Sequence, residues 1–235
     1  MQCAPSSGLE PELLRALALS AIDVRCAVGV AVDIAQPSSR AARRRSATLA
    51  ALAELGVDAA VEPATATSGE PLWPDGLVGS LSHSDDCSLA VVAESSTTGG
   101  LGIDLERDVR VSHAFARRVC SDAEFALIRR WAADPEGWAL VVFSAKEAVY
   151  KLQFPYSRQV VGLRRVEIEL QEDERFVATF REALPPFERG FALEGSWRRQ
   201  HGMILTSAWL RLTWHGSAVR STRSFVRSSN LALTY

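Results

Sequence analysis

The chain has 235 residues, a formal net charge of −2 and a sequence pI of about 6.1. It is long enough to bury a hydrophobic core without disulfides, and its charge balance excludes a protein that binds nucleic acid through a strongly basic overall field. No run of about 18 uncharged apolar residues occurs, so no membrane-spanning helix is expected. The first residues lack a basic signal-peptide start, and the expected location is the cytoplasm. The four cysteines have no metal-ligand spacing and are expected to be free thiols.

The first half of the chain alternates between helical and strand patterns. Residues 11–22 are predicted to form a helix, and residues 24–34 a strand buried on both faces. A second helix is expected to begin after Ser38 or Ser39, either of which can cap it, and to end at Gly56. Two further strands are predicted, at residues 87–94 and 101–106.

A stretch rich in glycine, serine and threonine at residues 94–102 is predicted to be a hinge between two halves. The corresponding domains are residues 1–99 and 100–235. No repeat is visible in the sequence itself, although helices and strands follow each other similarly in both halves.

In the second half, Ser121 is predicted to cap a helix, with Glu124 completing a capping box. Pro135 ends that segment, and another helix is expected from about Gly137 to Gln153. Two alternating segments around a polar turn predict a hairpin at residues 164–170 and 175–180, and at least one further strand is expected within residues 202–214. These patterns predict an α+β fold.

Both lysines of the chain, Lys146 and Lys151, lie in the helix predicted to end at Gln153, whereas all other basic residues are arginines. That helix is apolar almost all round and is therefore expected to be buried. Charged side chains on a buried helix need partners or a bound ion. The alternative is an ordinary helical ion pair between Glu147 and Lys151, worth about 0.2–0.5 kcal/mol, which is too little to justify burial.

The predicted strand with the sequence LGIDLE, residues 101–106, carries two acids. Because side chains alternate along a strand, Asp104 and Glu106 share one face, about 6.6 Å apart at roughly 3.3 Å per residue. Like charges at this spacing repel each other unless a cation lies between them, and Mg²⁺ accepts oxygen ligands from one or two carboxylates. The alternative is a solvated edge strand with two surface acids.

Hydroxyl groups surround a histidine in GSLSHSDD, residues 79–86, which is predicted to be a turn before a strand. A histidine in this setting can donate to phosphate oxygens or accept a proton. The alternative for His83 is an ordinary loop residue, because a lone histidine carries little functional information.

Three segments, PLWPDGLVGSLSH, LGIDLE and FSAKEAVYK, follow each other in this order. Together they resemble the 4′-phosphopantetheinyl transferases of surfactin and enterobactin synthesis, whose signature is G-[IV]-D-x-[ED] followed about forty residues later by [FW]-[ST]-x-K-E-[AS]-x-x-K. The resemblance covers about residues 40–170. It implies a monomer of two pseudo-symmetric α/β halves with coenzyme A bound between them. It also implies transfer of the phosphopantetheine arm from coenzyme A to a serine of an apo acyl or peptidyl carrier protein, with release of adenosine 3′,5′-bisphosphate.

The resemblance assigns roles to the charged residues. Asp104, Glu106 and Glu147 would hold one Mg²⁺, or Mn²⁺, together with the pyrophosphate of coenzyme A. Lys151 would stabilise charge on the phosphate oxygens, and Lys146 would reach another phosphate or orient the site. The base that accepts the serine proton would be Glu147 or a metal-bound water.

By the same resemblance, the first half would bind the adenosine end of coenzyme A. Ser82 and His83 would contact the 3′-phosphate, together with an arginine of the helix that ends at Gly56. Arg45 is the first candidate and Arg40 the second, and a solvated basic helix face is the alternative for both. The adenine pocket would be lined by Gly69, Glu70 and Pro71.

Arginines between the two motifs suit docking of an acidic carrier helix through an apolar patch rimmed by charge. The residues of this patch are Phe115, Arg117, Arg118, Phe125, Leu127, Arg129 and Arg130. No nucleic-acid or membrane partner is expected. Two other functions fit part of the pattern: a Mg²⁺-dependent nucleotide phosphohydrolase, and an inactive homologue that only binds the carrier. The inactive homologue would be expected to have lost Asp104, Glu147 or Lys151, and all three are present.

Overall fold

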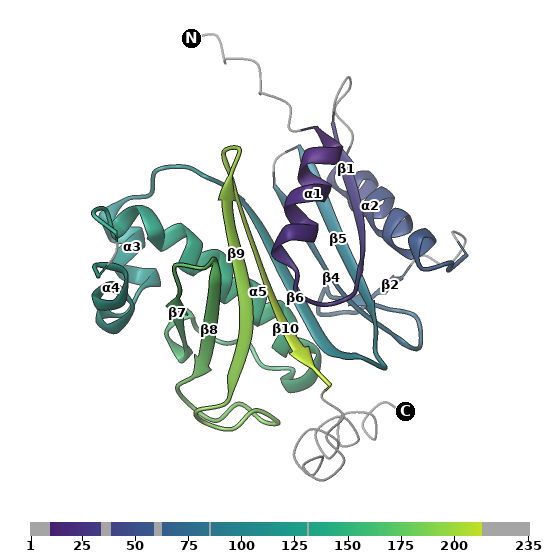
Figure 1. Cartoon of the computed structure of the whole chain (residues 1–235). Coiled ribbons are helices and arrows are strands. Elements are labelled where there is room, and N and C mark those ends of the chain that lie inside the picture. Colours follow the sequence, from purple (N-terminus) through teal and green to yellow (C-terminus); the bar gives the residue numbers. More distant parts are fainter. Residues whose placement is uncertain (1–9, 34–38, 59–62, 85, 131, 213–235) are drawn as a thin grey trace.

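The computed structural model describes residues 10–33, 39–58, 63–84, 86–130 and 132–212. In these segments the chain forms antiparallel sheets of three and five strands and a short two-stranded hairpin, with helices packed on the two larger sheets (Figure 1). The predicted α+β class is confirmed. None of the helices in these segments is long and apolar enough to cross a bilayer. Cys3 and residues 213–214, the end of the last predicted strand region, lie outside the described part.

The first sheet has the order β1 (Ala27–Val32), β5 (Cys87–Glu94) and β4 (Leu77–Ser84). One face packs against α2 (Arg40–Glu54), and the other packs against α1 (Pro11–Ala21). The hairpin that precedes β4 consists of β2 (Ala64–Thr65) and β3 (Pro71–Leu72).

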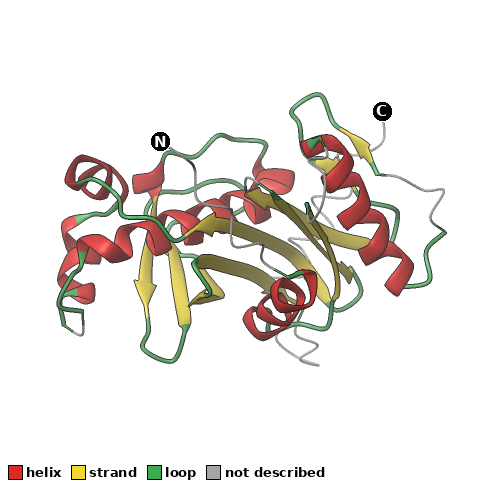
Figure 2. Ribbon diagram, turned by 90° about the horizontal axis from the view of Figure 1, so that it is seen from above, coloured by secondary structure: helices red, strands yellow, loops and turns green. Residues whose placement is uncertain are grey.

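The second sheet has the order β6 (Thr98–Arg107), β10 (Met203–Arg211), β9 (Ala192–Gln200), β8 (Arg175–Phe180) and β7 (Val166–Leu170). The long helix α5 (Ala139–Ser157) packs on one face of it, and Figure 2 shows helices on both sides of the strands. The remaining short helices are α3 (His113–Val119), α4 (Asp122–Ile128), η1 (Glu136–Trp138) and η2 (Leu163–Arg165).

Local sequence signals account for the predicted helix starts. The Ser39 hydroxyl accepts a hydrogen bond from the Ala42 amide at the start of α2. Ser121 and Glu124 form both bonds of a capping box at the start of α4. Gly56, just beyond α2, has φ +75°, a conformation that glycine adopts without strain. The caps therefore formed where the residue types predicted them.

The two halves repeat one close contact between a strand and a helix. A Cβ atom on Gly29 of β1 would lie 1.8 Å from the carbonyl oxygen of Ala47 in α2. A Cβ atom on Gly102 of β6 would lie 1.9 Å from the carbonyl oxygen of Ala148 in α5. In both halves a glycine lets a helix backbone approach the first strand of that half closely. The two expected pseudo-symmetric halves therefore share this strand–helix contact.

One of the hydrophobic clusters contains residues from both halves. It joins α1, β1 and β5 to β6 and β10, and the Ala21 carbonyl at the end of α1 accepts hydrogen bonds from the hydroxyls of Ser196 and Ser207. Residues 98–102, within the predicted hinge, are buried strand residues of β6. The boundary between residues 99 and 100 stays a prediction, but the glycine-rich stretch is a turn and a strand rather than a linker.

Several predicted boundaries are wrong. The helix capped by Ser121 ends at Ile128, well before Pro135. Residues 79–84 continue β4 instead of forming a turn, because Leu77–Ser84 pairs along its whole length with β5. Helix α5 continues past Gln153 to Ser157 with Pro155 in its last turn. The proline removes only one amide donor there, and the helix ends immediately afterwards.

Candidate active site

A cavity of about 810 Å³ lies between the two halves. Its walls come from the β3 region and β4 of the first half, and from β6 and the C-terminal part of α5 in the second. Aromatic side chains of both halves line it, among them Trp73, Tyr150, Phe154 and Tyr156. A cavity of this size and lining is typical of a small-molecule site.

Lys151 lines this cavity and is bonded to the acidic strand β6. Its ammonium group donates to Asp104 Oδ1 at 2.7 Å and to the Ile103 carbonyl at 3.0 Å. It also donates at 3.0 Å to the Ser82 hydroxyl, which itself donates to Asp104 Oδ1 at 3.1 Å. The Leu105 amide bonds to the same hydroxyl at 3.0 Å. The network therefore fixes Asp104 and Lys151 relative to both β4 and β6.

Glu147 lies one helical turn before Lys151 on α5, on the same helix face. Burial raises the pKa of the Glu147 carboxyl, the negative charge of Asp104 raises it further, and Lys151 partly offsets both effects. The structure thus brings Asp104, Glu147 and Lys151 into one electrostatic group, as the sequence predicts.

The donor set fits a hard divalent cation. Asp104 is only 5% exposed, and its Oδ2 atom is buried without a hydrogen-bond partner among the described residues. A buried carboxylate oxygen without a donor, beside a second carboxylate, is a position where an ion such as Mg²⁺ is favourable. Glu106 is partly exposed and lies two residues further along β6. As the described side chains stand, no three acidic, histidine or cysteine residues form a ready metal site, so the set Asp104, Glu106 and Glu147 stays a prediction.

The structure separates Lys146 from this group. Its ammonium donates to the Val119 carbonyl at 2.8 Å and to Glu124 at 2.8 and 3.0 Å, and the side chain is 2% exposed. Glu124 also accepts hydrogen bonds from the Ser121 amide at 2.6 Å and the Ile168 amide at 2.8 Å. The structure therefore contradicts the predicted phosphate contact of Lys146 and leaves its alternative orienting role, because the ammonium is buried against Glu124 and Lys146 does not line the large cavity.

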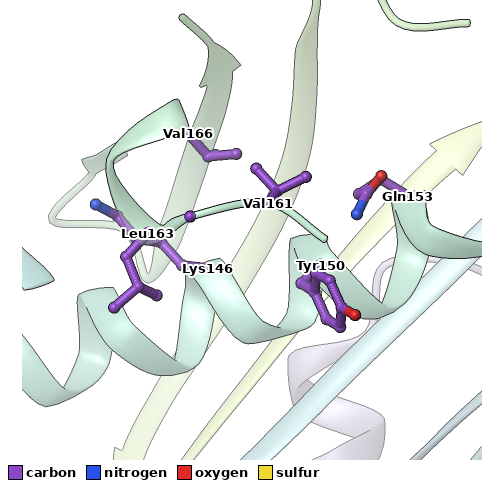
Figure 3. A pocket seen from close by; sticks show the side chains of 7 residues that line it. Lys146, Tyr150, Gln153, Val161, Leu163 and Val166 are labelled. Carbon is purple, nitrogen blue, oxygen red and sulfur yellow. The ribbon is translucent and has the colours of Figure 1, made fainter. Parts of the chain in front are cut away.

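A second, water-sized cavity of about 20 Å³ lies on the Lys146 side of α5. Figure 3 shows Lys146, Tyr150 and Gln153 along the helix, beside the segment that carries Val161 and Leu163. Tyr150 lines both this cavity and the large one.

The predicted phosphate ligands Ser82 and His83 lie on β4, not in a turn, and point to opposite faces of the strand. Ser82 is buried, and its hydroxyl bonds Asp104 and Lys151, so it holds the acidic group rather than presenting a free donor. His83 is exposed. Partial burial lowers the pKa of His83, and the nearby charges of Arg40, Lys151 and Arg44 lower it further.

The basic helix α2 presents a different arginine from the one first expected. Arg44 lines the large cavity, whereas Arg45 is exposed and is absent from its lining. Arg40 lies one turn before Arg44 and, like it, lies close enough to His83 to lower its pKa. Helical spacing could have grouped Arg40 with Arg44, because residues four apart share a helix face, whereas Arg45 is turned by about 100° from Arg44.

The hairpin β2–β3 places Gly69, Glu70 and Pro71 in the cavity wall, and their contact with adenine stays a prediction. Gly69 has φ +95° in the turn of the hairpin, and its amide donates to the Ala66 carbonyl. Sequence reasoning did not identify Arg158, which lines the same cavity and forms an ion pair with Glu70.

The predicted carrier patch is more polar than expected. Arg117, Arg118, Arg129 and Arg130 are exposed, but Phe125 is only 2% exposed and lies beneath Arg117 and Arg129, whose guanidinium groups are 5.9 and 5.5 Å from its ring centre. The apolar part of the prediction is therefore wrong for Phe125, because the aromatic ring belongs to the core of α4.

Comparisons with known proteins agree with this geometry. Residues 100–202 match the 4′-phosphopantetheinyl transferase superfamily, and residues 31–93 match the 4′-phosphopantetheinyl transferase N-terminal domain. The chain is 32% identical over 149 residues to 4′-phosphopantetheinyl transferase PptT of Mycobacterium tuberculosis, a match that covers 59% of this chain and 64% of PptT.

Two further relatives have similar sequence identity to this chain. The 4′-phosphopantetheinyl transferase Npt of Nocardia iowensis is 31% identical, with 67% of this chain and 75% of Npt covered. Enterobactin synthase component D of Salmonella typhi is 37% identical over 110 residues, which is 46% of this chain and 44% of that protein. The chain thus spans between about two fifths and three quarters of these relatives, and it belongs to the 4′-phosphopantetheinyl transferase superfamily.

Proposed function

We propose that this chain transfers 4′-phosphopantetheine from coenzyme A to a serine of an apo carrier protein, in a Mg²⁺-dependent reaction that releases adenosine 3′,5′-bisphosphate. It would act as a monomer in the cytoplasm. The observation that carries the proposal is the group of Asp104, Glu147 and Lys151 beside the large cavity, where the buried Asp104 Oδ2 has no donor within the described part of the chain. Membership of the superfamily supports the reaction class.

In the proposed reaction the serine oxygen attacks the phosphorus that carries the pantetheine arm, and the phosphoanhydride bond to the adenosine side breaks. Asp104 and Glu147, with Glu106, would hold Mg²⁺, which when bound would neutralise charge on the pyrophosphate. Lys151 stabilises the negative charge that grows on the phosphate oxygens. The serine proton passes to Glu147 or to a water beside it.

The first half would bind the adenosine end of the donor. Arg44, with Arg40 and His83 nearby, forms a cationic group suited to the 3′-phosphate. Gly69 and Pro71 would contact the adenine from the hairpin wall. Arg44 replaces Arg45 as the proposed phosphate ligand, because Arg44 lines the cavity and Arg45 does not.

The carrier protein would dock on the exposed arginines of α3 and α4. Helix α3 packs against α5, which carries Glu147 and Lys151, and α4 packs against β7 and is joined to α5 by the Glu124–Lys146 ion pair. An acidic partner helix is the expected ligand for such a basic surface.

Mass spectrometry of intact apo-carriers tests the proposal. Incubation with the enzyme, coenzyme A and Mg²⁺ should add about 340 Da, the mass of the phosphopantetheine arm. A carrier with its acceptor serine replaced by alanine should gain nothing, and chelation of the metal should abolish the reaction until Mg²⁺ is restored. A phosphohydrolase would instead release adenosine 3′,5′-bisphosphate without any carrier, and an inactive homologue would bind carrier without the mass gain. Either result would refute the proposal.

A further inference from the structure

Among the described residues, the charged lining of the large cavity contains one acid. Arg44, Lys151 and Arg158 bring positive charge to the wall, and Glu70 brings negative charge. A carboxylate is unfavourable beside a ligand that carries three phosphate groups unless a cation compensates it. The contacts of Glu70 show where that cation comes from.

Glu70 is held firmly in the hairpin wall. Its backbone carbonyl accepts a bond from the Ala66 amide at 2.9 Å, and its carboxylate accepts the Ser68 hydroxyl at 2.5 Å. The other carboxylate oxygen accepts a bond from the Arg158 guanidinium group. The Glu70 side chain is only 13% exposed, so the carboxylate gives Arg158 a fixed attachment point on the opposite wall.

Arg158 comes from the second half, 88 residues away in the sequence. It follows the last residue of α5, where its amide donates to the Phe154 carbonyl at 2.9 Å and its backbone is left-handed, with φ 54°. Its side chain is 48% exposed. Among the described residues, Glu70 is the partner to which the Arg158 side chain donates a hydrogen bond. The guanidinium group of an arginine has five N–H donors in total.

Lys151 and Arg158 are seven residues apart, which is two helical turns, or about 10 Å along the axis at 1.5 Å per residue. Both line the same cavity. Two cations that line one cavity at about this separation can contact phosphate groups at different positions of one ligand.

We propose that Arg158 binds a phosphate group of the coenzyme A donor and that Glu70 positions its guanidinium group over the cavity. This inference rests on the proposed function and adds a binding residue to it. A planar guanidinium group can bond a carboxylate with one edge and a phosphate with another, which a lysine cannot do in the same way. The phosphate is either the 3′-phosphate or the pyrophosphate, and both present the same oxygen acceptors.

The test compares Arg158→Gln with the wild-type enzyme in calorimetric titrations with coenzyme A. Binding of coenzyme A should weaken about tenfold, as expected for the loss of one charge-assisted hydrogen bond. Arg165→Gln is the matched control, because Arg165 is also 48% exposed and paired with an acid, Glu182, but does not line the cavity. It should bind coenzyme A as the wild type does.

Dephospho-coenzyme A, which lacks the 3′-phosphate, locates the contact. If Arg158 binds the 3′-phosphate, Arg158→Gln should bind this analogue as the wild type does; if it binds the pyrophosphate, affinity should fall about tenfold for both ligands. Unchanged affinity of Arg158→Gln for coenzyme A would overturn the inference while leaving the proposed function intact. Failure of the wild type to bind coenzyme A would overturn both.

A second pair of variants separates ligand binding from simple neutralisation of Glu70. In a Glu70→Gln background, Arg158→Gln should still weaken coenzyme A binding severalfold, but less than in the wild-type background, because the guanidinium group still reaches the phosphate although the carboxylate no longer positions it. If the effect of Arg158→Gln disappears in that background, Arg158 serves only to neutralise Glu70, and the inference is wrong.

Discussion

The Lys146 ammonium lies 2.8 Å from Glu124 Oε1, and the two side chains are 2% and 0% exposed. Removal of one partner leaves a buried charge uncompensated, so we expect Lys146→Met to lower the free energy of unfolding by about 3–5 kcal/mol. Urea unfolding measures this change. The exposed pair of Arg165 and Glu182 is the comparison, and Arg165→Met should cost about 0–1 kcal/mol. Equal losses in the two variants would show that burial does not make the Lys146 pair special.

The same pair explains why the sequence could not assign Lys146. The helical pattern predicts correctly that the helix is buried. The partner of Lys146 is 22 residues away, on α4, and nothing in the local sequence marks that contact. A family signature identifies which residues occur together, but a buried charge is assigned only once its neighbours in space are known.

Lys151→Arg tests whether a compact charge is needed at the proposed site. The Lys151 ammonium has three oxygen atoms within 3.0 Å, those of Ser82, Ile103 and Asp104. A guanidinium group is larger and planar and cannot occupy the same point. We expect kcat for carrier modification to fall about 10²–10³-fold with folding intact, by analogy with loss of a transition-state donor. Wild-type turnover in this variant would mean that positive charge alone is sufficient.

Glu147→Gln should separate stability from activity. A carboxyl group whose pKa is higher in the folded than in the unfolded state destabilises the folded state at pH values above its unfolded pKa. Burial and the negative charge of Asp104 raise the pKa of Glu147 in the folded protein. In the metal-free protein at pH 7 the variant should therefore be as stable as the wild type or more stable, and the difference should vanish below about pH 4, where the carboxyl is protonated in both states. Thermal melts across this range measure it.

Activity should change in the opposite direction in Glu147→Gln. Loss of the carboxylate should weaken Mn²⁺ binding, measured by electron paramagnetic resonance, and reduce turnover. A variant that is less stable than the wild type at pH 7 and still fully active would contradict both the charge repulsion and the proposed metal role.

The close approach of β6 and α5 predicts a large effect of one methyl group. In Gly102→Ala the new Cβ atom would lie 1.9 Å from the Ala148 carbonyl and 2.8 Å from the Leu152 amide, so backbone must move. We expect a loss of about 3 kcal/mol or more, within the range for overpacked cores. Gly162→Ala is the control, since nothing lies within 4 Å of its Cβ position, and should be neutral or slightly stabilising.

Sequence patterns predicted most elements because their signals are local. Serine caps and two-residue alternation need only a few neighbouring residues, and they correctly predicted where α2 and α4 begin and where β6 lies. Strand β9 was not predicted, because Gly195 and several charges interrupt its pattern. In the structure Gly195 makes room for the Phe176 ring, whose Cζ would lie 2.0 Å from an added Cβ. The sequence likewise could not show that Arg44 and Arg158 line the cavity, because the cavity is formed by segments that are far apart in the sequence.

The exposed arginines over Phe125 predict how the carrier is recognised. Arg117 and Arg129 flank the same buried ring, so they present two fixed positive charges on one surface. Charge reversal of both to glutamate should raise the KM for an acidic carrier about tenfold or more, because attraction becomes repulsion. The KM for coenzyme A should stay unchanged, since neither residue lines the large cavity.

Arg189→Glu is the matched control for this experiment. Arg189 is also exposed but lies between β8 and β9, away from α3 and α4. Its reversal changes the net charge in the same direction without altering the proposed docking surface.

Steady-state kinetics at two salt concentrations should show a KM for the carrier that depends less on salt in the Arg117 and Arg129 double variant than in the wild type. If Arg189→Glu raised this KM as much as the double variant does, overall charge rather than a defined surface would govern recognition of the carrier.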